Sequence, residues 1–239
     1  MAHLNNVRDG RASKVYLLTH GTEKATEVKL GGIYVVSKIA AESSKLGNLA
    51  VGDYYVATGK SAIELAEGDE LIEVTPHFIG GATDKDLSFE KSTTSITCDK
   101  DEAENVTSNG VVAISGSITA YDLIQTGDTA ANMIKQRFNK MVSYGADGAP
   151  TAKEMDRTMK DVLMFVWDAR DLDDGEFVAI DFVPAFLSSQ GHNSAYGSGQ
   201  TFPINFTGAD TDEAGHRRST HILLYQKEIG DAIAKWDAS

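Results

Sequence analysis

The sequence predicts a mainly β protein, an antiparallel β sandwich or partial barrel with one flanking α-helix. Three observations favour this class. Short runs rich in Val, Ile, Thr and Tyr recur along the chain, separated by Gly, Asp and Asn, which is typical of strands joined by turns. Two of the longer runs alternate apolar with small polar side chains, as in a sheet with one buried face. One segment between the strands spaces its apolar residues like a helix.

Composition limits the kinds of function to be considered. The 239 residues include 35 Asp and Glu against 22 Lys and Arg, a net charge of −13. A nucleic-acid or anionic-membrane binder needs clustered basic residues, so neither function is expected. The lone Cys98 excludes an internal disulfide and a cysteine-rich zinc cluster. No apolar run is long enough to span a bilayer, and the N-terminus lacks a secretion signal, so we expect synthesis in a cytoplasm.

The N-terminal part is expected to be an arm followed by four strands. Residues 1–14 are polar and contain a glycine, which predicts a segment that is mobile or ordered only by a partner. The strands are expected near Val15–Thr19, Ile33–Ile39, Asp53–Thr58 and Glu70–Thr75. We expect residues 15–239 to form a single domain, in which residues 20–65 are an extra β subdomain or a long loop.

Two long strands with a small polar face are predicted in the middle of the chain. Residues 87–98 are rich in Ser and Thr and lead into the acidic loop DKDEAEN. In the following run, 111–121, Val112, Ile114 and Ile118 alternate with small residues. Such strands suit a sheet with one face in the core and the other on a wet surface.

The helix and the remaining strands complete the predicted fold. Asp128 or Thr129 can cap a helix that Gly145 ends. Its apolar stripe consists of Ala130, Ile134, Phe138, Met141 and Val142. The runs DVLMFVWDA and EFVAIDFVPAFL flank the turn DLDDG and predict a hairpin. TFPINFTGA and HILLYQ are two more strands, and EIGDAIAKWDAS is a short amphipathic tail.

No pattern of residues predicts catalysis. Nucleotide-binding, zinc-protease and nucleophile-elbow motifs are absent. The segment DARDLDDGEFVAID resembles a calcium loop, but Arg170 and Leu172 stand where ligands should be. His216 and His221 have no fixed metal geometry, and the paired acids are those of solvated loops. We therefore expect no enzyme, no catalytic residue, no cofactor and no metal.

The order of segments resembles a known family. A polar arm is followed by TSITCDKDEAEN, the strand VVAISGSITAY, one amphipathic helix, a hairpin and the strand TFPINFTGAD. Over residues 65–225 this resembles the tail tube (major tail) proteins of long-tailed bacteriophages. Residues 20–65 fit that pattern less well, which leaves the domain boundary open.

The resemblance implies a structural virion protein made in the bacterial cytoplasm. Subunits would form hexameric rings, and the rings would stack into a hollow tail tube through which DNA passes without specific binding. Strands of neighbouring subunits would complete the inner sheet. The other partners implied are phage tail proteins such as the terminator and the tape measure, and no membrane.

Three groups of residues are candidates for these roles. Ser92, Thr94, Ser115, Ser117 and Thr119 are candidates for the lumen-facing strands; Leu4, Val7 and Arg8 for an arm between rings; and Asp99, Asp101, Glu102 and Glu104 for an acidic loop. An acidic wall would repel phosphate, which suits a conduit.

Two other classes of protein compete with this interpretation. A capsid decoration or other virion protein would form discrete oligomers or bind capsids. A β-sandwich carbohydrate-binding module or hydrolase would be a monomer with an aromatic or acidic pocket, although the sequence has only two tryptophans, Trp167 and Trp236.

Overall fold

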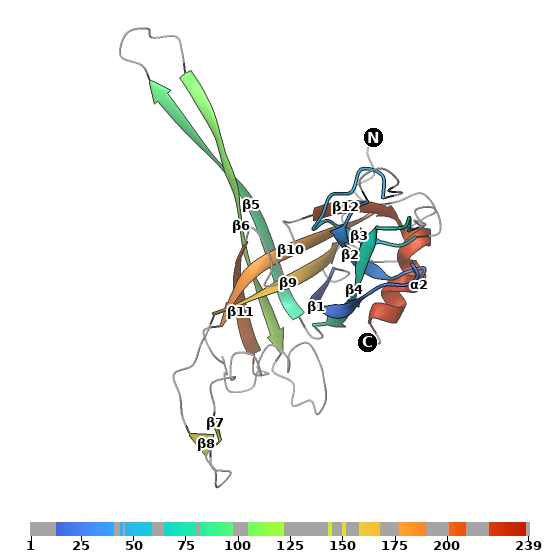
Figure 1. Ribbon diagram of the computed structural model, residues 1–239. Coiled ribbons are helices and arrows are strands. Elements are labelled where there is room, and N and C mark those ends of the chain that lie inside the picture. Colours follow the sequence, from blue (N-terminus) through green and yellow to red (C-terminus); the bar gives the residue numbers. More distant parts are fainter. Residues whose placement is uncertain are drawn as a thin grey trace, which may run out of the picture.

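The protein is mainly β, as the sequence predicts. The computed structural model describes residues 13–40, 44, 46–58, 65–79, 82–97, 105–121, 143–144, 150–151, 158–167, 177–189, 201–208 and 220–237. Within this part, ten strands form one antiparallel sheet, flanked by a helix near the C-terminus (Figure 1). A separate short pair consists of β7 (Ser143–Tyr144) and β8 (Pro150–Thr151).

The strands of the main sheet match those expected from the sequence. They are β1 (Lys14–Lys24), β2 (Ile33–Lys38), β3 (Tyr54–Val56), β4 (Glu70–Phe78), β5 (Ala82–Thr97), β6 (Asn105–Tyr121), β9 (Thr158–Trp167), β10 (Phe177–Ser189), β11 (Thr201–Gly208) and β12 (Thr220–Tyr225). Their order is β3-β2-β4-β1-β9-β10-β11-β6-β5, and β12 also pairs with β10. The two long Ser/Thr-rich strands, β5 and β6, begin five and six residues earlier than expected.

The sheet forks at β10. One edge of β10 pairs with β9, as the predicted hairpin requires. The other edge pairs first with β12, over residues 177–182, and then with β11, over residues 185–189. Pro184 lies between these two ladders and has a partner only in β9, so its missing N–H removes no bond to β11 or β12.

The central strands β1, β9 and β10 are buried on both faces. On one face Tyr16, Met164 and Phe182 belong to a cluster that α2 (Gln226–Trp236) covers. On the other face a second cluster joins these strands to β11 and β6. Burial on both faces explains why the β9 sequence is an unbroken apolar run from residue 162 to 166.

The helix packs with its small apolar face on the sheet. Ala232, Ile233 and Trp236 are buried, and Trp236 Nε1 donates a hydrogen bond of 3.0 Å to the carbonyl oxygen of Gly31. The predicted amphipathic tail is therefore the flanking helix that the structure describes. The helix expected over residues 130–142 lies outside the described residues.

Residues 25–71 add a small lobe beyond β4. Here β2 and β3 extend the main sheet, and a third cluster includes Tyr34, Leu46 and Leu71. Every member of that cluster lies between residues 25 and 71. A division of the chain at this point stays a prediction, because β2 also contributes Ile33 and Val35 to the cluster under α2.

The sheet curls so that distant strands in its order come close together. The backbone N–H of Ile79 donates to the carbonyl oxygen of Val15 in β1, at 2.9 Å. Only three residues later, Ala82 begins β5, at the far end of the strand order. Since three Cα–Cα steps span at most about 11 Å, the start of β5 lies near β1.

Candidate assembly surface

One face of the four strands β10, β11, β6 and β5 carries mostly small polar side chains. Residues that pair directly across antiparallel strands share a face, so the pairing defines it. Ser117, for example, pairs with Asn205 on one side and Asp86 on the other. The polar face so defined consists of Phe186 and Ser188 (β10), Pro203, Asn205 and Thr207 (β11), Ser115, Ser117 and Thr119 (β6), and Asp84, Asp86 and Ser88 (β5).

The polar face is acidic and open. Asp84, Asp86, Ser115 and Thr207 are exposed, and Ser117, Thr119 and Asn205 are half-buried. Its eleven residues include two aspartates and no Lys, Arg or His. Lys160 of β9 pairs with Phe186 at the border of this face, so the two aspartates have one basic residue beside the face. Their negative charge disfavours the approach of phosphate. The ring of Phe186, 47% exposed, is the one large apolar group on the face.

The opposite face of the same strands is apolar and buried. Ile118, Ala120, Ile204 and Phe206 belong to the second core cluster and are at most 3% exposed. The predicted alternation along β6 is therefore confirmed in residues 114–120, and β11 alternates in the same way over residues 203–207. It arises because successive side chains of a strand point to opposite faces.

The predicted lumen-facing residues fall into two groups. Ser115, Ser117 and Thr119 lie side by side on the polar face. Farther along β5, Ser92 lies within a register shift between Lys91 and Thr93, and Thr94 lies beyond it, so the simple alternation does not extend to them. Whether any of these residues faces a lumen stays a prediction.

The other candidate residues lie outside the described part of the chain. These are the arm residues Leu4, Val7 and Arg8, and the acidic-loop residues Asp99, Asp101, Glu102 and Glu104. Sequence reasoning missed Asp84 and Asp86, because the predicted strand began at residue 87. Their period-two spacing with Ser88 was the signal that could have found them.

The hairpin of β5 and β6 extends beyond the body of the molecule. β11 pairs with β6 only over residues 115–121, whereas β5 pairs with β6 as far as Thr97 and Asn105. Figure 1 shows the resulting two-stranded ribbon projecting from the rest of the sheet. The nine residues of β5 beyond Ser88 reach about 30 Å, so the ribbon can contact a neighbouring molecule.

The edges of the sheet differ in length. β3, at one end of the strand order, has 3 residues, whereas β5, at the other end, has 16. Within the part of the chain that the structure describes, β5 pairs only with β6, and no other strand lies along its outer edge. Natural proteins avoid long open edges, because such edges add further strands.

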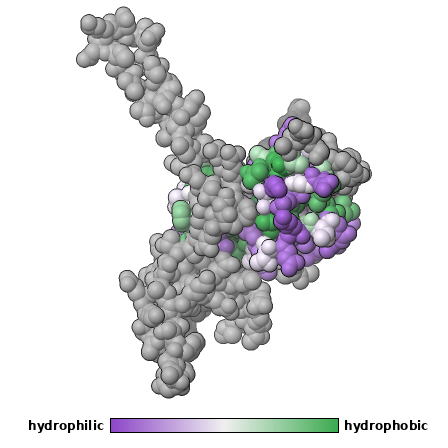
Figure 2. Space-filling view, viewed as in Figure 1, coloured by the Kyte–Doolittle hydropathy of each residue, from purple (hydrophilic) through white to green (hydrophobic). Residues whose placement is uncertain are grey.

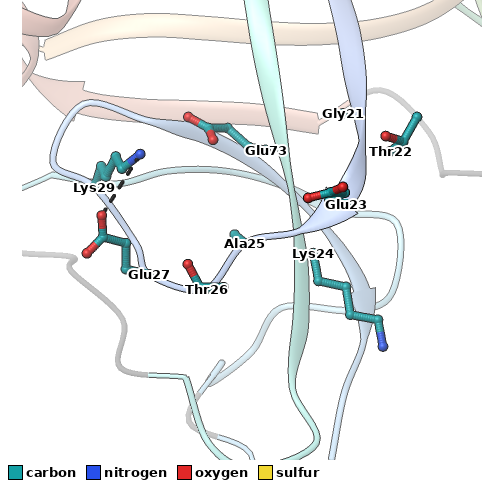
Figure 3. A pocket seen from close by; sticks show the side chains of 9 residues that line it. All are labelled: Gly21, Thr22, Glu23, Lys24, Ala25, Thr26, Glu27, Lys29 and Glu73. Atoms are coloured by element: carbon teal, nitrogen blue, oxygen red, sulfur yellow. Dashed lines mark ion pairs between the residues drawn. The ribbon is translucent and has the colours of Figure 1, made fainter.

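A polar depression of about 410 Å³ lies at a bulge in β1 (Figure 3). Between His20 and Lys24 the register with β4 slips by two residues, which bends the chain away opposite Glu73. Glu27 and Lys29 lie side by side in the lining and pair at 3.9 Å, and Lys24 forms an ion pair with Glu70. The hydrogen bond from Lys24 lowers the pKa of the Glu70 carboxyl. These exposed charges indicate a solvated surface.

Both tryptophans pack in or against the hydrophobic core clusters. Trp167 Nε1 donates a hydrogen bond of 2.6 Å to the buried Asp181, and Trp236, the last residue of α2, is buried in the first core cluster. Within the described ranges, the exposed aromatic rings Phe89 and Phe186 lie on opposite faces of the sheet. These rings therefore form no stacking platform of the kind that sugar-binding sites use.

Figure 2 shows hydrophilic residues over much of the part of the molecule that contains β2 and β4. Among the residues the structure describes, no three His, Cys, Asp or Glu side chains are grouped to hold a metal. No helix in that part of the chain is long and apolar enough to cross a membrane.

No protein-family model matches the chain, and no curated protein is detectably similar to it. Function is therefore inferred from the surfaces described above and from the resemblance over residues 65–225.

Proposed function

We propose that the chain is a structural subunit that assembles with copies of itself into rings stacked as a hollow phage tail tube. The observation that carries this proposal is the polar face of β10, β11, β6 and β5. It is a continuous sheet surface whose eleven residues include two aspartates and no cation, and it is backed by a packed core. A conduit for DNA needs such a wall, because every phosphate contact with a Lys or Arg would slow the cargo.

The shape of the sheet also favours the proposal. The start of β5 lies near β1, and this curl supports the proposal of a partial barrel. A curled sheet with one polar face can form a segment of a larger wall, if several copies stand around an axis. The closed rings of homo-oligomers arise from this kind of repeated contact.

The projecting ribbon supplies a second contact between subunits. Outside the body of the molecule, the described part of β5 beyond residue 91 has only its partner β6. An isolated two-stranded ribbon is marginally stable in water. Packing on an adjacent subunit would stabilise it and would join one ring to the next.

The experiment that tests this function is electron microscopy of the purified protein in negative stain, before and after concentration, with sedimentation velocity on the same samples. Hollow tubes or stacked six-fold rings are the expected result. Discrete trimers would indicate a decoration protein. Monomers at every concentration, including after addition of a tail initiator complex, would overturn the proposal.

A further inference from the structure

A β-bulge interrupts the ribbon of β5 and β6 close to the body of the molecule. Lys91 pairs with Val112, and the next pair along the ribbon is Thr93 with Asn109. Between these pairs β5 has one residue and β6 has two. Two residues that face one define a β-bulge, which bends the bulged strand and disrupts the ladder at that point.

The bulge lies beyond the last residue at which a third strand supports β6. β11 pairs with β6 only as far as Ser115, three residues before Val112. Beyond the bulge β5 and β6 pair again, over residues 93–97 and 105–109. The bulge therefore divides the ribbon into a root, which the sheet holds, and an outer ladder formed by these two ranges.

The residues at the bulge favour a change of direction. The two residues of β6 that face Ser92 are Gly110 and Val111, and Asn109 precedes them. Glycine enters backbone conformations that other residues avoid, and Asn-Gly is a dipeptide that favours turns. A glycine inside a strand often marks a bulge or a bend. The chain can therefore bend here without the loss of a pair on either side.

The outer ladder has little apart from its backbone bonds to fix its angle. Its five pairs consist of Ser, Thr and Asn, except for Ile96 with Val106. From Ser92 to Thr97 and from Asn105 to Tyr121 the sequence has no charged residue, so no ion pair can form between these strand segments. The charged and large apolar pairs that stabilise a sheet are therefore scarce in the outer ladder.

We propose that the bulge is a hinge, about which the outer ladder turns as a unit while the pairs on both sides of it stay formed. Hinges are typically a few residues that absorb a change of φ and ψ. Here Gly110 and Val111 absorb the change, and the two paired ladders are the rigid elements. The hinge belongs to the single subunit and does not depend on the proposed tube. In any assembly it would let the ribbon meet a neighbouring molecule at more than one angle.

A second bulge in the same pair of strands provides a matched comparison. Ala82 pairs with Ala120 and Asp84 with Thr119, so that Thr83 is the extra residue, this time in β5. At this bulge β11 pairs with β6 along its other edge. The three-stranded sheet therefore holds the second bulge, and we expect no hinge there.

Distances between pairs of spin labels test the hinge in the full chain, with Cys98→Ser in every variant. One label is at Lys235→Cys, on the exposed side of α2, and the other is at Glu90→Cys or Thr94→Cys, one on each side of the bulge. An excess of unlabelled chain keeps the measured distances within one subunit. We expect the distance distribution at position 94 to be at least about twice as wide as that at position 90.

Labels at Lys91→Cys and Thr93→Cys locate the change, because the width should rise in one step between these two positions. A gradual increase along β5 would mean that the ribbon flexes along its whole length, and equal widths would mean that it is rigid. Either result would overturn the proposal. The series requires no deletion, so it decides the question even where a deletion variant fails to fold.

Deletion of a single residue tests whether the bulge itself is the cause. Without Gly110, one residue of β6 faces Ser92 and every other pair of the ladder is kept. The width at position 94 should then fall to that at position 90. Deletion of Thr83 removes the second bulge and should leave the width at position 94 unchanged. An unchanged width without Gly110, or an equal narrowing after both deletions, would contradict the hinge.

Discussion

Two glycines, Gly116 and Gly208, leave room for apolar side chains that pack between β6 and β11. A Cβ atom on Gly116 would lie 2.0 Å from the carbonyl oxygen of Asp86 and 2.4 Å from the ring of Phe206. On Gly208 it would lie 2.8 Å from the Cβ of Ile114. Both glycines therefore allow β11 and β6 to pack their apolar side chains across the strands.

Gly116→Ala should destabilise the fold by about 1–3 kcal/mol, because the new methyl group overpacks a rigid site. The neighbouring exposed residue provides the matched control, and Ser115→Ala should change the free energy of unfolding by less than about 0.5 kcal/mol. Urea unfolding of both variants measures the difference. Equal stability of the two would show that the sheet relaxes around the added methyl.

Tyr16 joins the start of β1 to the end of α2. Its hydroxyl donates to Asp237 Oδ1 at 2.7 Å, and Lys14 forms an ion pair with the same carboxylate. Burial above all, and then the hydrogen bond to Asp237, raises the pKa of Tyr16 above its usual value of 10.0. The folded state therefore holds this proton more tightly than the unfolded chain does.

The stability that this proton contributes is complete below pH 10 and is lost as the pH rises beyond it. We expect the free energy of unfolding to fall above pH 10, and the fall to be less steep in Tyr16→Phe. Urea unfolding at a series of alkaline pH values measures both slopes. Identical slopes would contradict the assignment to Tyr16.

Among the elements, α2 covers the cluster on one face of the central strands. Trp236 contributes the largest side chain of its buried face, in edge contact with Tyr16 at 6.1 Å. The turn at Gly31 accepts the hydrogen bond from Trp236. Gly31 has a positive φ of 79°, and a Cβ atom there would lie 2.9 Å from the Cβ of Ala232.

Trp236→Ala should cost about 3–5 kcal/mol, since it removes a large buried ring and leaves a cavity. Lys235→Ala, on the exposed side of the same turn, should cost less than about 0.5 kcal/mol. Thermal unfolding followed by circular dichroism compares the two. Little difference between them would mean that α2 is not part of the cooperative fold.

The strands could be predicted from the sequence because local patterns define them. The alternation around Ser117 gave both the strand and its polar face, and the turn between residues 167 and 177 gave the hairpin. Strand order could not be predicted, because it depends on contacts between distant residues, such as the pairing of β1 with β9. The extension of β5 to Asp84 was missed because charged residues are uncommon in strands.

At the scale of the whole molecule, the relevant features are the negative charge of the polar face and the curl of the sheet. The polar face carries two aspartates, and the sheet curls. In the proposed tube several copies would surround an axis with this face toward the DNA. A change of sign on this face should therefore alter how an assembly handles DNA, without changing the core.

The double variant Asp84→Lys, Asp86→Lys should leave folding intact and should make assembled particles retain duplex DNA at low salt. Raising the salt should release it, because the contacts depend on released counterions. Asp231→Lys on the exposed side of α2 is the control and should retain no DNA. Filter retention of duplex DNA at several salt concentrations measures the binding. Equal retention by both variants would mean that the polar face does not face the DNA.

Electron cryomicroscopy of the assembled protein tests the central claim most directly. We predict a hollow particle in which Ser117, Thr119 and Asp86 line the bore. A particle with this face on its outer surface, or a solid particle without a bore, would contradict the account.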